Sequence, residues 1–230
     1  MNARLLPLAT LVFGVVTLLI TLAFPQLPSV RVAHFAQGDF SAALNAFQRA
    51  ATPADLAAVF GAPPDLTILD AMTAGNRLDL FAFIPSYTLF LACAALTVAG
   101  GLKRRLAWLT LALLAIALAG DVIETSTQLA ITADYARART HLPVAPWCWT
   151  KFIGLGAYSW AIALASLGER KRYVLALLNL PPLPATLAAF FGLTPSMQGA
   201  SLAFAAAWIA LLVIAALELL RKDRRESTSA

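Results

Sequence analysis

Charged residues are scarce in this chain of 230 residues. Lys, Arg, Asp and Glu make up 13% of it, hydrophobic residues make up 60%, and the mean hydropathy is +0.76. A soluble domain has about 25% charged residues, so this composition excludes the soluble globular class. The sequence instead predicts an all-α polytopic membrane protein in which residues 1–230 form a single transmembrane domain.

Cysteine and histidine are also rare, with two of each. Cys93 lies deep in one apolar stretch and Cys148 lies at the end of another, which separates them in depth by about 20 Å. A separation of that size argues against a disulfide and against thiol redox chemistry. His34 and His141 alone are too few for a haem or a multi-histidine metal centre. The sequence therefore identifies no cofactor.

Apolar stretches are abundant, and six are long enough to cross a membrane, which takes about 20 helical residues. The first exceeds the apolar core of a secretory signal and lacks a small-x-small cleavage site, so it is expected to remain as an anchor. The predicted membrane helices span residues 5–24, 78–99, 106–132, 147–167, 172–192 and 199–220.

Basic residues indicate the orientation, because short loops rich in Lys and Arg stay in the cytoplasm. Five arginines lie on one side of the predicted helices and eleven basic residues lie on the other. Both termini are therefore predicted to be cytoplasmic, in a bacterial inner membrane. Attraction to anionic lipid explains the net charge of +5, so membrane lipids are expected partners and nucleic acid is not. The cytoplasmic group comprises Arg4, Lys103, Arg104, Arg105, Arg170, Lys171, Arg172, Arg221, Lys222, Arg224 and Arg225.

The one long segment outside the membrane, residues 25–77, is predicted to form a small extracytoplasmic helical cap between the first two membrane helices. Phe40, Leu44 and Phe47 recur at helical spacing, and Thr52–Asp55 is typical of a helix start with proline in its first turn. About fifty residues cannot build a large core alone. The cap is therefore expected to pack on the outer membrane face, the alternative being a mobile interfacial loop.

Four ionisable residues, Asp79, Asp121, Glu124 and Lys151, lie inside or at the edge of the predicted membrane helices. Charges are costly in hydrocarbon unless they are paired, hydrated or functional, so each marks a candidate site. Helical periodicity puts Asp121, Glu124 and Gln128 on one face that opens outward. Asp79 is expected in the first turn of its helix, where the helix dipole favours an acid, at a depth similar to that of Lys151.

The predicted site gives each of these residues a role. Either Asp121 or Glu124 would accept a proton or bind the ligand, and Lys151 would set the charge of that carboxylate. Three acids facing one base leave an excess of negative charge, which a divalent ion could balance, although the sequence identifies no metal. The candidate catalytic residues are Asp121, Glu124 and Lys151, and the candidate substrate-binding residues are Asp79, Tyr87 and Gln128.

Three functions fit this polar cluster. The leading one is the handling of a lipid or small molecule at an outward-facing intramembrane site, with or without catalysis. A proton-coupled transporter is the second, because Pro181, Pro182 and Pro184 would break a helix and expose its ends. The third is a structural or assembly subunit in which Lys151 forms a packing ion pair. Small residues at 154–157 permit close helix contact within the chain or between chains, so the oligomeric state stays open.

The segment Leu78–Tyr87, read together with Asp121–Glu124, resembles a recurrent family of uncharacterised bacterial multi-pass membrane proteins. Its members pair an Asp-x-x-Phe-x-Pro-x-Tyr-like helix start with a later Asp-x-x-Glu-Asn and a downstream lysine. Lys151 fits the lysine, and Thr125 stands in the place of the asparagine. The resemblance covers the second to fourth predicted helices and implies that the polar cluster belongs to the identity of the fold. It brings no established activity.

Overall fold

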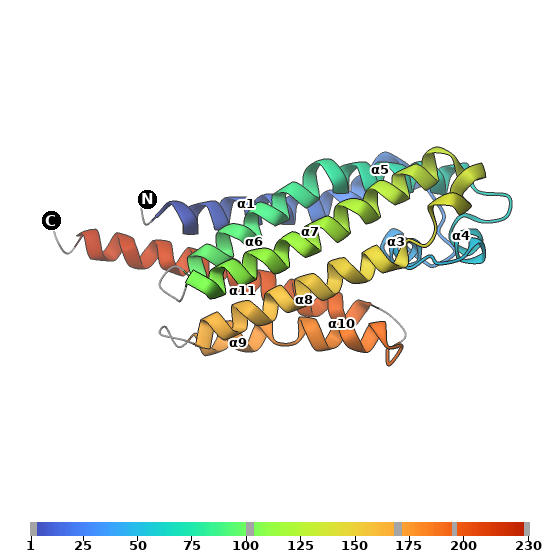
Figure 1. Ribbon diagram of the computed structural model, residues 1–230. Helices are drawn as coiled ribbons and strands as arrows, with labels where there is room; N and C mark the ends of the chain where they lie inside the picture. Colours follow the sequence, from blue (N-terminus) through green and yellow to red (C-terminus); the bar gives the residue numbers. More distant parts are fainter. Residues whose placement is uncertain (1–3, 100–103, 168–171, 195–196, 228–230) are drawn as a thin grey trace. The chain divides into compact units, whose positions relative to one another are not determined.

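The computed structural model describes residues 4–99, 104–167, 172–194 and 197–227. The chain in these ranges is helical and has no β-strand, which confirms the all-α prediction (Figure 1). Three of the predicted cytoplasmic basic residues, Lys103, Arg170 and Lys171, lie outside them. The elements are α1 (Leu5–Ala23), the 3-10 helix η1 (Phe24–Gln26), α2 (Pro28–Val32), α3 (Phe40–Gln48), α4 (Pro53–Phe60), α5 (Leu66–Leu78), the π-helix η2 (Asp79–Phe83), α6 (Ile84–Ala99), α7 (Arg104–Ala133), the 3-10 helix η3 (Tyr135–His141), α8 (Ala145–Leu167), α9 (Tyr173–Asn179), α10 (Pro182–Phe190) and α11 (Gln198–Ser227).

Five helical stretches in the described chain are long and apolar enough to cross a membrane, which indicates a multi-pass membrane protein. The sixth predicted span is present as α8, a helix of 23 residues. It is not among the five, because its first half contains Pro146, two tryptophans and Lys151. The five stretches are Leu5–Val32, Leu66–Val98, Arg105–Ala133, Tyr173–Phe190 and Gln198–Leu220.

The second membrane helix is longer than predicted, because α5, η2 and α6 follow one another without a break from Leu66 to Ala99. Asp79 therefore lies within a continuous helix, and its predicted place in a first turn was wrong. The π-helical turn has a local cause in Pro85, which has no N–H and whose ring crowds the carbonyl four residues earlier. Wider spacing relieves this crowding, and the Ile84 N–H donates to the Asp79 carbonyl.

The described chain divides into two compact units. The first unit comprises Met1–Thr17, Ser86–Ala117 and Phe152–Ala230. The second unit comprises Leu18–Pro85 and Leu118–Lys151. The second unit therefore holds the whole predicted cap and all four ionisable residues of the candidate site.

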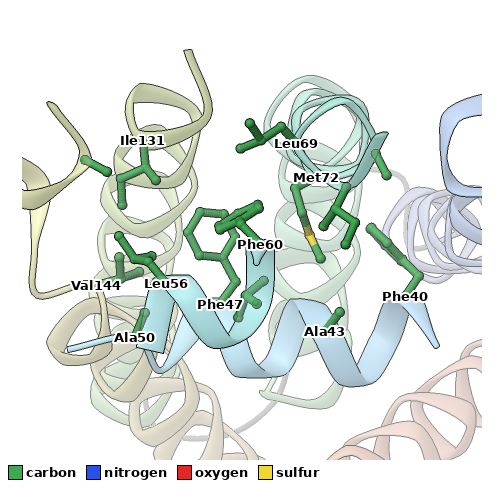
Figure 2. Close-up of a cluster of buried hydrophobic side chains, with 14 of the residues drawn as sticks. Phe40, Ala43, Phe47, Ala50, Leu56, Phe60, Leu69, Met72, Ile131 and Val144 are labelled. Atoms are coloured by element: carbon green, nitrogen blue, oxygen red, sulfur yellow. The ribbon is translucent and has the colours of Figure 1, made fainter. Parts of the chain in front are cut away.

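The second unit has an apolar core of its own, shown in Figure 2. Phe47 of α3 and Phe60 of α4 meet edge to face, with ring centroids 4.9 Å apart, and Ile131 of α7 is buried in the same cluster. The predicted cap thus shares a core with the end of α7, as a packed helical layer does and a mobile loop does not. Buried members of this core include Phe40, Ala43, Phe47, Leu56, Phe60, Leu69, Met72, Ile131 and Val144.

Helix starts in the cap follow local sequence rules. The predicted start at Thr52 is confirmed as a reciprocal capping box with Asp55. Asp39 and Asp65 are simple N-caps of α3 and α5, and their carboxylates accept from the Ala42 and Thr67 backbone N–H groups. Hydrogen bonds from the Ala51 backbone N–H and from Thr52 lower the pKa of the Asp55 carboxyl below its ordinary value. These N-cap residues determine where α3, α4 and α5 begin.

The first unit is packed through small residues, as the sequence suggested. A side chain at Gly154 would meet Ala117 of α7 at 3.0 Å, and one at Gly156 would meet Leu183 of α10 at 2.9 Å. The run at 154–157 therefore makes close helix contacts within this chain. The first unit also contains a partly buried ion pair between Arg172 and Glu218 of α11, although Arg221 follows Glu218 by only three residues in the sequence.

The predicted break in the fifth membrane segment is confirmed, because α9 ends at Asn179 and α10 begins at Pro182. Pro184 has no N–H to offer the Leu180 carbonyl. The indole N–H of Trp160 in α8 donates to that carbonyl instead, at 2.7 Å. A side chain from a neighbouring helix thus supplies the donor that the prolines remove.

Candidate functional site

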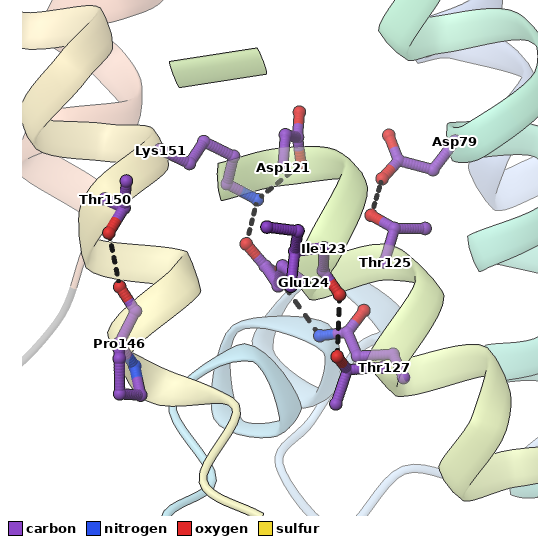
Figure 3. Close-up of polar contacts among 10 residues, drawn as sticks. Asp79, Asp121, Ile123, Glu124, Thr125, Thr127, Pro146, Thr150 and Lys151 are labelled. Carbon is purple, nitrogen blue, oxygen red and sulfur yellow. Dashed lines mark hydrogen bonds and ion pairs between the residues drawn. The ribbon is translucent and has the colours of Figure 1, made fainter. Parts of the chain in front are cut away.

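The centre of the site is Lys151 of α8, whose ammonium group lies between two carboxylates of α7 (Figure 3). Its Nζ is 3.1 Å from Asp121 Oδ1 and 2.7 Å from Glu124 Oε2. The residue exposures are 6% for Lys151, 3% for Asp121 and 0% for Glu124. The prediction that these three residues converge is therefore correct, and both acids, rather than one, contact the lysine.

The approach of α8 to α7 depends on Gly120. A side chain at this position would stand 2.8 Å from the Lys151 backbone nitrogen and 3.1 Å from Thr150. Glycine therefore allows the two helix backbones to touch at the level of the ion pairs. Asp121 follows Gly120 directly, so this contact places its carboxylate within reach of Lys151.

Gln128 completes the coordination of Glu124. It lies one turn later on the same face of α7, is 1% exposed, and donates from Nε2 to Glu124 Oε1 at 3.3 Å. The two oxygens of Glu124 thus face different donors, the Lys151 ammonium and the Gln128 amide. This arrangement fixes the plane of the Glu124 carboxylate and leaves it little capacity for a further ligand.

The third carboxylate, Asp79, is held differently. Its Oδ2 accepts a hydrogen bond from the Thr125 hydroxyl at 2.9 Å, as Figure 3 shows. In the part of the chain that the structure describes, no cation lies within ion-pairing distance of it. Asp79 is also half-buried, whereas the other two acids are fully buried. Asp79 therefore keeps acceptor capacity that the Lys151 ammonium does not use.

Tyr87, the remaining predicted site residue, belongs to the first unit. It is 1% exposed, and its ring stacks on Trp208 of α11 with centroids 5.7 Å apart. Packing inside the first unit accounts for this side chain. Its predicted role in substrate binding stays a prediction.

The geometry also bears on the divalent ion considered from the sequence. The Lys151 ammonium occupies the position between Asp121 and Glu124 that a metal ion would need. Over residues 4–99, 104–167, 172–194 and 197–227, no three His, Cys, Asp or Glu side chains are grouped as a metal site requires. The cluster described here works with an ammonium group as its cation.

Two residues of the site carry roles that the sequence pattern did not assign. Thr125 lies beside Glu124 and donates to Asp79; a hydroxyl can do there what the asparagine amide of the resembled motif would do. Asn76 lies one turn before Asp79 on α5, is 1% exposed, and its Nδ2 has no hydrogen-bond partner. The i, i+3 spacing of Asn76 and Asp79 was the available signal for it.

Four residues of the resembled motifs, Asp79, Asp121, Glu124 and Lys151, lie in the second unit, whereas Tyr87 lies in the first. Comparison of the chain with family models, with curated proteins and with solved structures gives no match. The resemblance stays a prediction, and the function has to be inferred from the geometry of these side chains.

Proposed function

We propose that this chain is an integral membrane protein that binds a lipid or small molecule at an outward-facing site formed by Asp79, Asp121, Glu124 and Lys151. Asp79 is the group that meets the ligand. Lys151 and the two acids of α7 form the charged floor that positions it. Asp121 or Glu124 serves as proton acceptor where binding is followed by chemistry or proton movement.

The main support for this proposal is that the three acids have different partners. Lys151 contacts Asp121 and Glu124, while Asp79 receives a single hydroxyl donor from Thr125. A purely structural ion pair needs one acid and one base, and apolar residues often pack as well or better in its place. Two further carboxylates in an apolar helix cluster add desolvation cost without adding a cation. Ligand binding gives them a use.

The proposal includes a topology. Six membrane helices, with α8 as the fourth, place both termini in the cytoplasm of a bacterium and the cap outside its inner membrane. The cap core includes Ile131, one turn beyond Gln128 on α7, which supports a site near the cap, in the outer half of the membrane. A ligand would then reach Asp79 from the membrane side, as an amphiphile does.

Two observations favour other candidates. Lys151 is paired with both acids of α7, as a packing ion pair in an assembly subunit would be. The helix break between α9 and α10 is the device that proton-coupled transporters use. The Trp160 indole N–H, however, already donates to the Leu180 carbonyl at this break. This hydrogen bond favours a break that does not move.

The test compares wild type with Asp79→Asn, Asp121→Asn and Glu124→Gln. Each protein is purified in mild detergent, its thermal unfolding is measured, and the molecules that co-purify with it are identified by mass spectrometry. Glu218→Gln is the matched control, because it neutralises a partly buried carboxylate paired with Arg172 in the first unit.

A bound species that is present in wild type and in Glu218→Gln, and lost from a stable Asp79→Asn or Glu124→Gln protein, supports the proposal. Retention of that species in all three site variants contradicts it. Collapse of the Asp121 and Glu124 variants, together with a wild type that brings nothing along, favours the packing ion pair and sinks the binding function.

A further inference from the structure

Resting on this proposed function, we propose that the ligand presents hydroxyl groups to the site and that Asn76 and Asp79 bind them together. The ligand class is a polyol or sugar head group. Asn76 is then a specificity-determining residue. The inference follows from where Asn76 lies, from its unused donor, and from a kind of group that satisfies both side chains.

Two observations relate α5 to α7. Asp79 meets Thr125, whereas Met72 shares the apolar core with Ile131 (Figure 2). Residue numbers rise from 125 to 131 on α7 in the direction in which they fall from 79 to 72 on α5. The two helices therefore run antiparallel. Asn76 lies one turn before Asp79 on α5 and Gln128 lies one turn after Thr125 on α7, so the two residues lie at a similar level.

Asn76 therefore lies between the apolar core of the cap and the charged cluster. Its side chain is 1% exposed, and its Nδ2 has no hydrogen-bond partner. An unused amide donor in such a place costs about 1–3 kcal/mol, and buried polar groups are normally paired. Met72 precedes Asn76 by one turn and Asp79 follows it by one turn, so these three residues share the face of α5 that meets α7.

The pair Asn76 and Asp79 offers one unused donor beside acceptor oxygens. Residues at i and i+3 on a helix have Cβ atoms about 5–6 Å apart, so one small group can touch both. An ammonium group supplies only donors and leaves the Asn76 amide unpaired. A phosphate or carboxylate supplies only acceptors and is repelled by three nearby acids. A hydroxyl donates to Asp79 and accepts from Asn76.

Several hydroxyls on one ligand strengthen this match, because Thr125 and Gln128 lie on the facing helix at the same two levels. Sugars and glycerol present neighbouring hydroxyls of this kind. The same chemistry has two sources, the head group of a membrane lipid and a free sugar. An experiment with both forms separates them.

The full chain is purified in dodecyldimethylamine oxide, which has no hydroxyl group, and its thermal unfolding is followed while one of three probes is added. Dodecyl maltoside presents a sugar on a twelve-carbon chain, maltose presents the sugar alone, and dodecylphosphocholine presents the same chain without hydroxyls. A ligand that binds only the folded state raises Tm with concentration. We expect dodecyl maltoside to raise Tm above the level that dodecylphosphocholine gives.

Two variants assign that effect to Asn76. Asn76→Leu keeps the number and branching of the side-chain heavy atoms and removes the unused amide, and Asn76→Ala removes it without adding volume. In Asn76→Leu, the dodecyl maltoside concentration that gives half of the Tm rise should be about tenfold higher, since one buried hydrogen bond is lost. Asn179→Leu is the matched control, because Asn179 is equally buried in the first unit and its amide already donates to the Leu175 carbonyl at 2.9 Å.

The outcomes separate cleanly. A rise with maltose as well as dodecyl maltoside identifies a free sugar as sufficient, whereas a rise with dodecyl maltoside alone identifies a lipid-linked one. Equal Tm values in dodecyl maltoside and dodecylphosphocholine overturn the inference, a comparison that wild type alone provides even if Asn76→Leu fails to fold. Full retention of the sugar effect in Asn76→Leu or Asn76→Ala overturns it too. A co-purifying ligand without hydroxyls, lost on Asp79→Asn, would leave the proposed function standing and reject this head group.

Discussion

The backbone nitrogen of Lys151 lies so close to Gly120 that a side chain at residue 120 would stand 2.8 Å from it. This contact between α7 and α8 occurs beside Asp121, and it brings the Lys151 ammonium to 3.1 Å from the Asp121 carboxylate. A residue with no charge and no hydrogen-bonding side chain therefore sets the geometry of the whole ionic cluster.

Gly120→Ala should destabilise the protein, because the added methyl group would contact the backbone nitrogen of Lys151, which cannot rotate away as a side chain can. Overpacking of this kind costs about 1–3 kcal/mol, seen as a lower Tm in detergent. Gly199→Ala is the control, since nothing lies within 4 Å of a side chain there and alanine favours helix over glycine by about 1 kcal/mol. Equal Tm changes in the two variants would contradict the close contact.

Lys151→Met should be the most damaging single change in the cluster. It leaves Asp121 and Glu124 buried without a cation, and breaking a buried ion pair by removing one partner costs about 3–5 kcal/mol. The triple variant with Asp121→Asn and Glu124→Gln should regain most of that loss, because no uncompensated charge remains. Unfolding in increasing dodecyl sulfate measures both. A triple variant as unstable as Lys151→Met would mean that packing of the lysine stem, rather than its charge, matters.

Phe47→Ala should loosen the cap and the end of α7 together. Phe47 is fully buried against Phe60, and replacing a buried phenylalanine by alanine costs about 3–5 kcal/mol. Amide hydrogen exchange around Ile131 should rise along with exchange in α3. Phe191→Ala, at a side chain that is 68% exposed, should change neither. Protection at Ile131 that survives Phe47→Ala would show that α7 does not depend on the cap core.

The capping box at the start of α4 predicts a pH dependence. Hydrogen bonds from the Ala51 N–H and from Thr52 lower the pKa of Asp55 in the folded chain. Its stabilisation is therefore fully present above the unfolded pKa of about 3.9 and is lost as pH falls through the folded pKa. Tm of wild type should drop more than Tm of Asp55→Ala between pH 6 and pH 3. Thr52→Ser, which keeps the cap, should follow wild type, and parallel curves for all three proteins would contradict the role of Asp55.

Local features of this chain could be predicted from sequence, and features set by packing could not. The cap at Thr52, the break at Pro181 and the shared face of Asp121, Glu124 and Gln128 each depend on a few neighbouring residues. They follow from helix periodicity and from the chemistry of proline and threonine. The structure agrees with each of them.

The position of Asp79 shows the limit of that approach. Hydropathy alone put a helix start at residue 78, where the membrane border was expected, yet the helix continues from Leu66. Helix continuity across such a border depends on the cap core that holds Leu69 and Met72. The contact between Asp79 and Thr125 and the isolation of the Asn76 amide likewise depend on the register of two helices, which no local pattern contains.

The break between α9 and α10 leads to the last prediction. The carbonyl of Leu180 would normally accept from the N–H of residue 184, which proline lacks, and Trp160 donates to it at 2.7 Å instead. Trp160→Phe keeps an aromatic ring but removes that donor. Water is absent from hydrocarbon, so the carbonyl stays unpaired at a cost of about 1–3 kcal/mol.

We expect Trp160→Phe to lower Tm and to speed amide hydrogen exchange in α10. The control is Trp108→Phe on α7, whose side chain is 61% exposed and should tolerate the change. The same variant also tests the transporter alternative. If the break must move for transport, freeing the carbonyl should change proton-linked uptake in proteoliposomes, whereas a static break changes stability alone. Unaltered exchange in α10 would show that the Trp160 hydrogen bond does not hold the break.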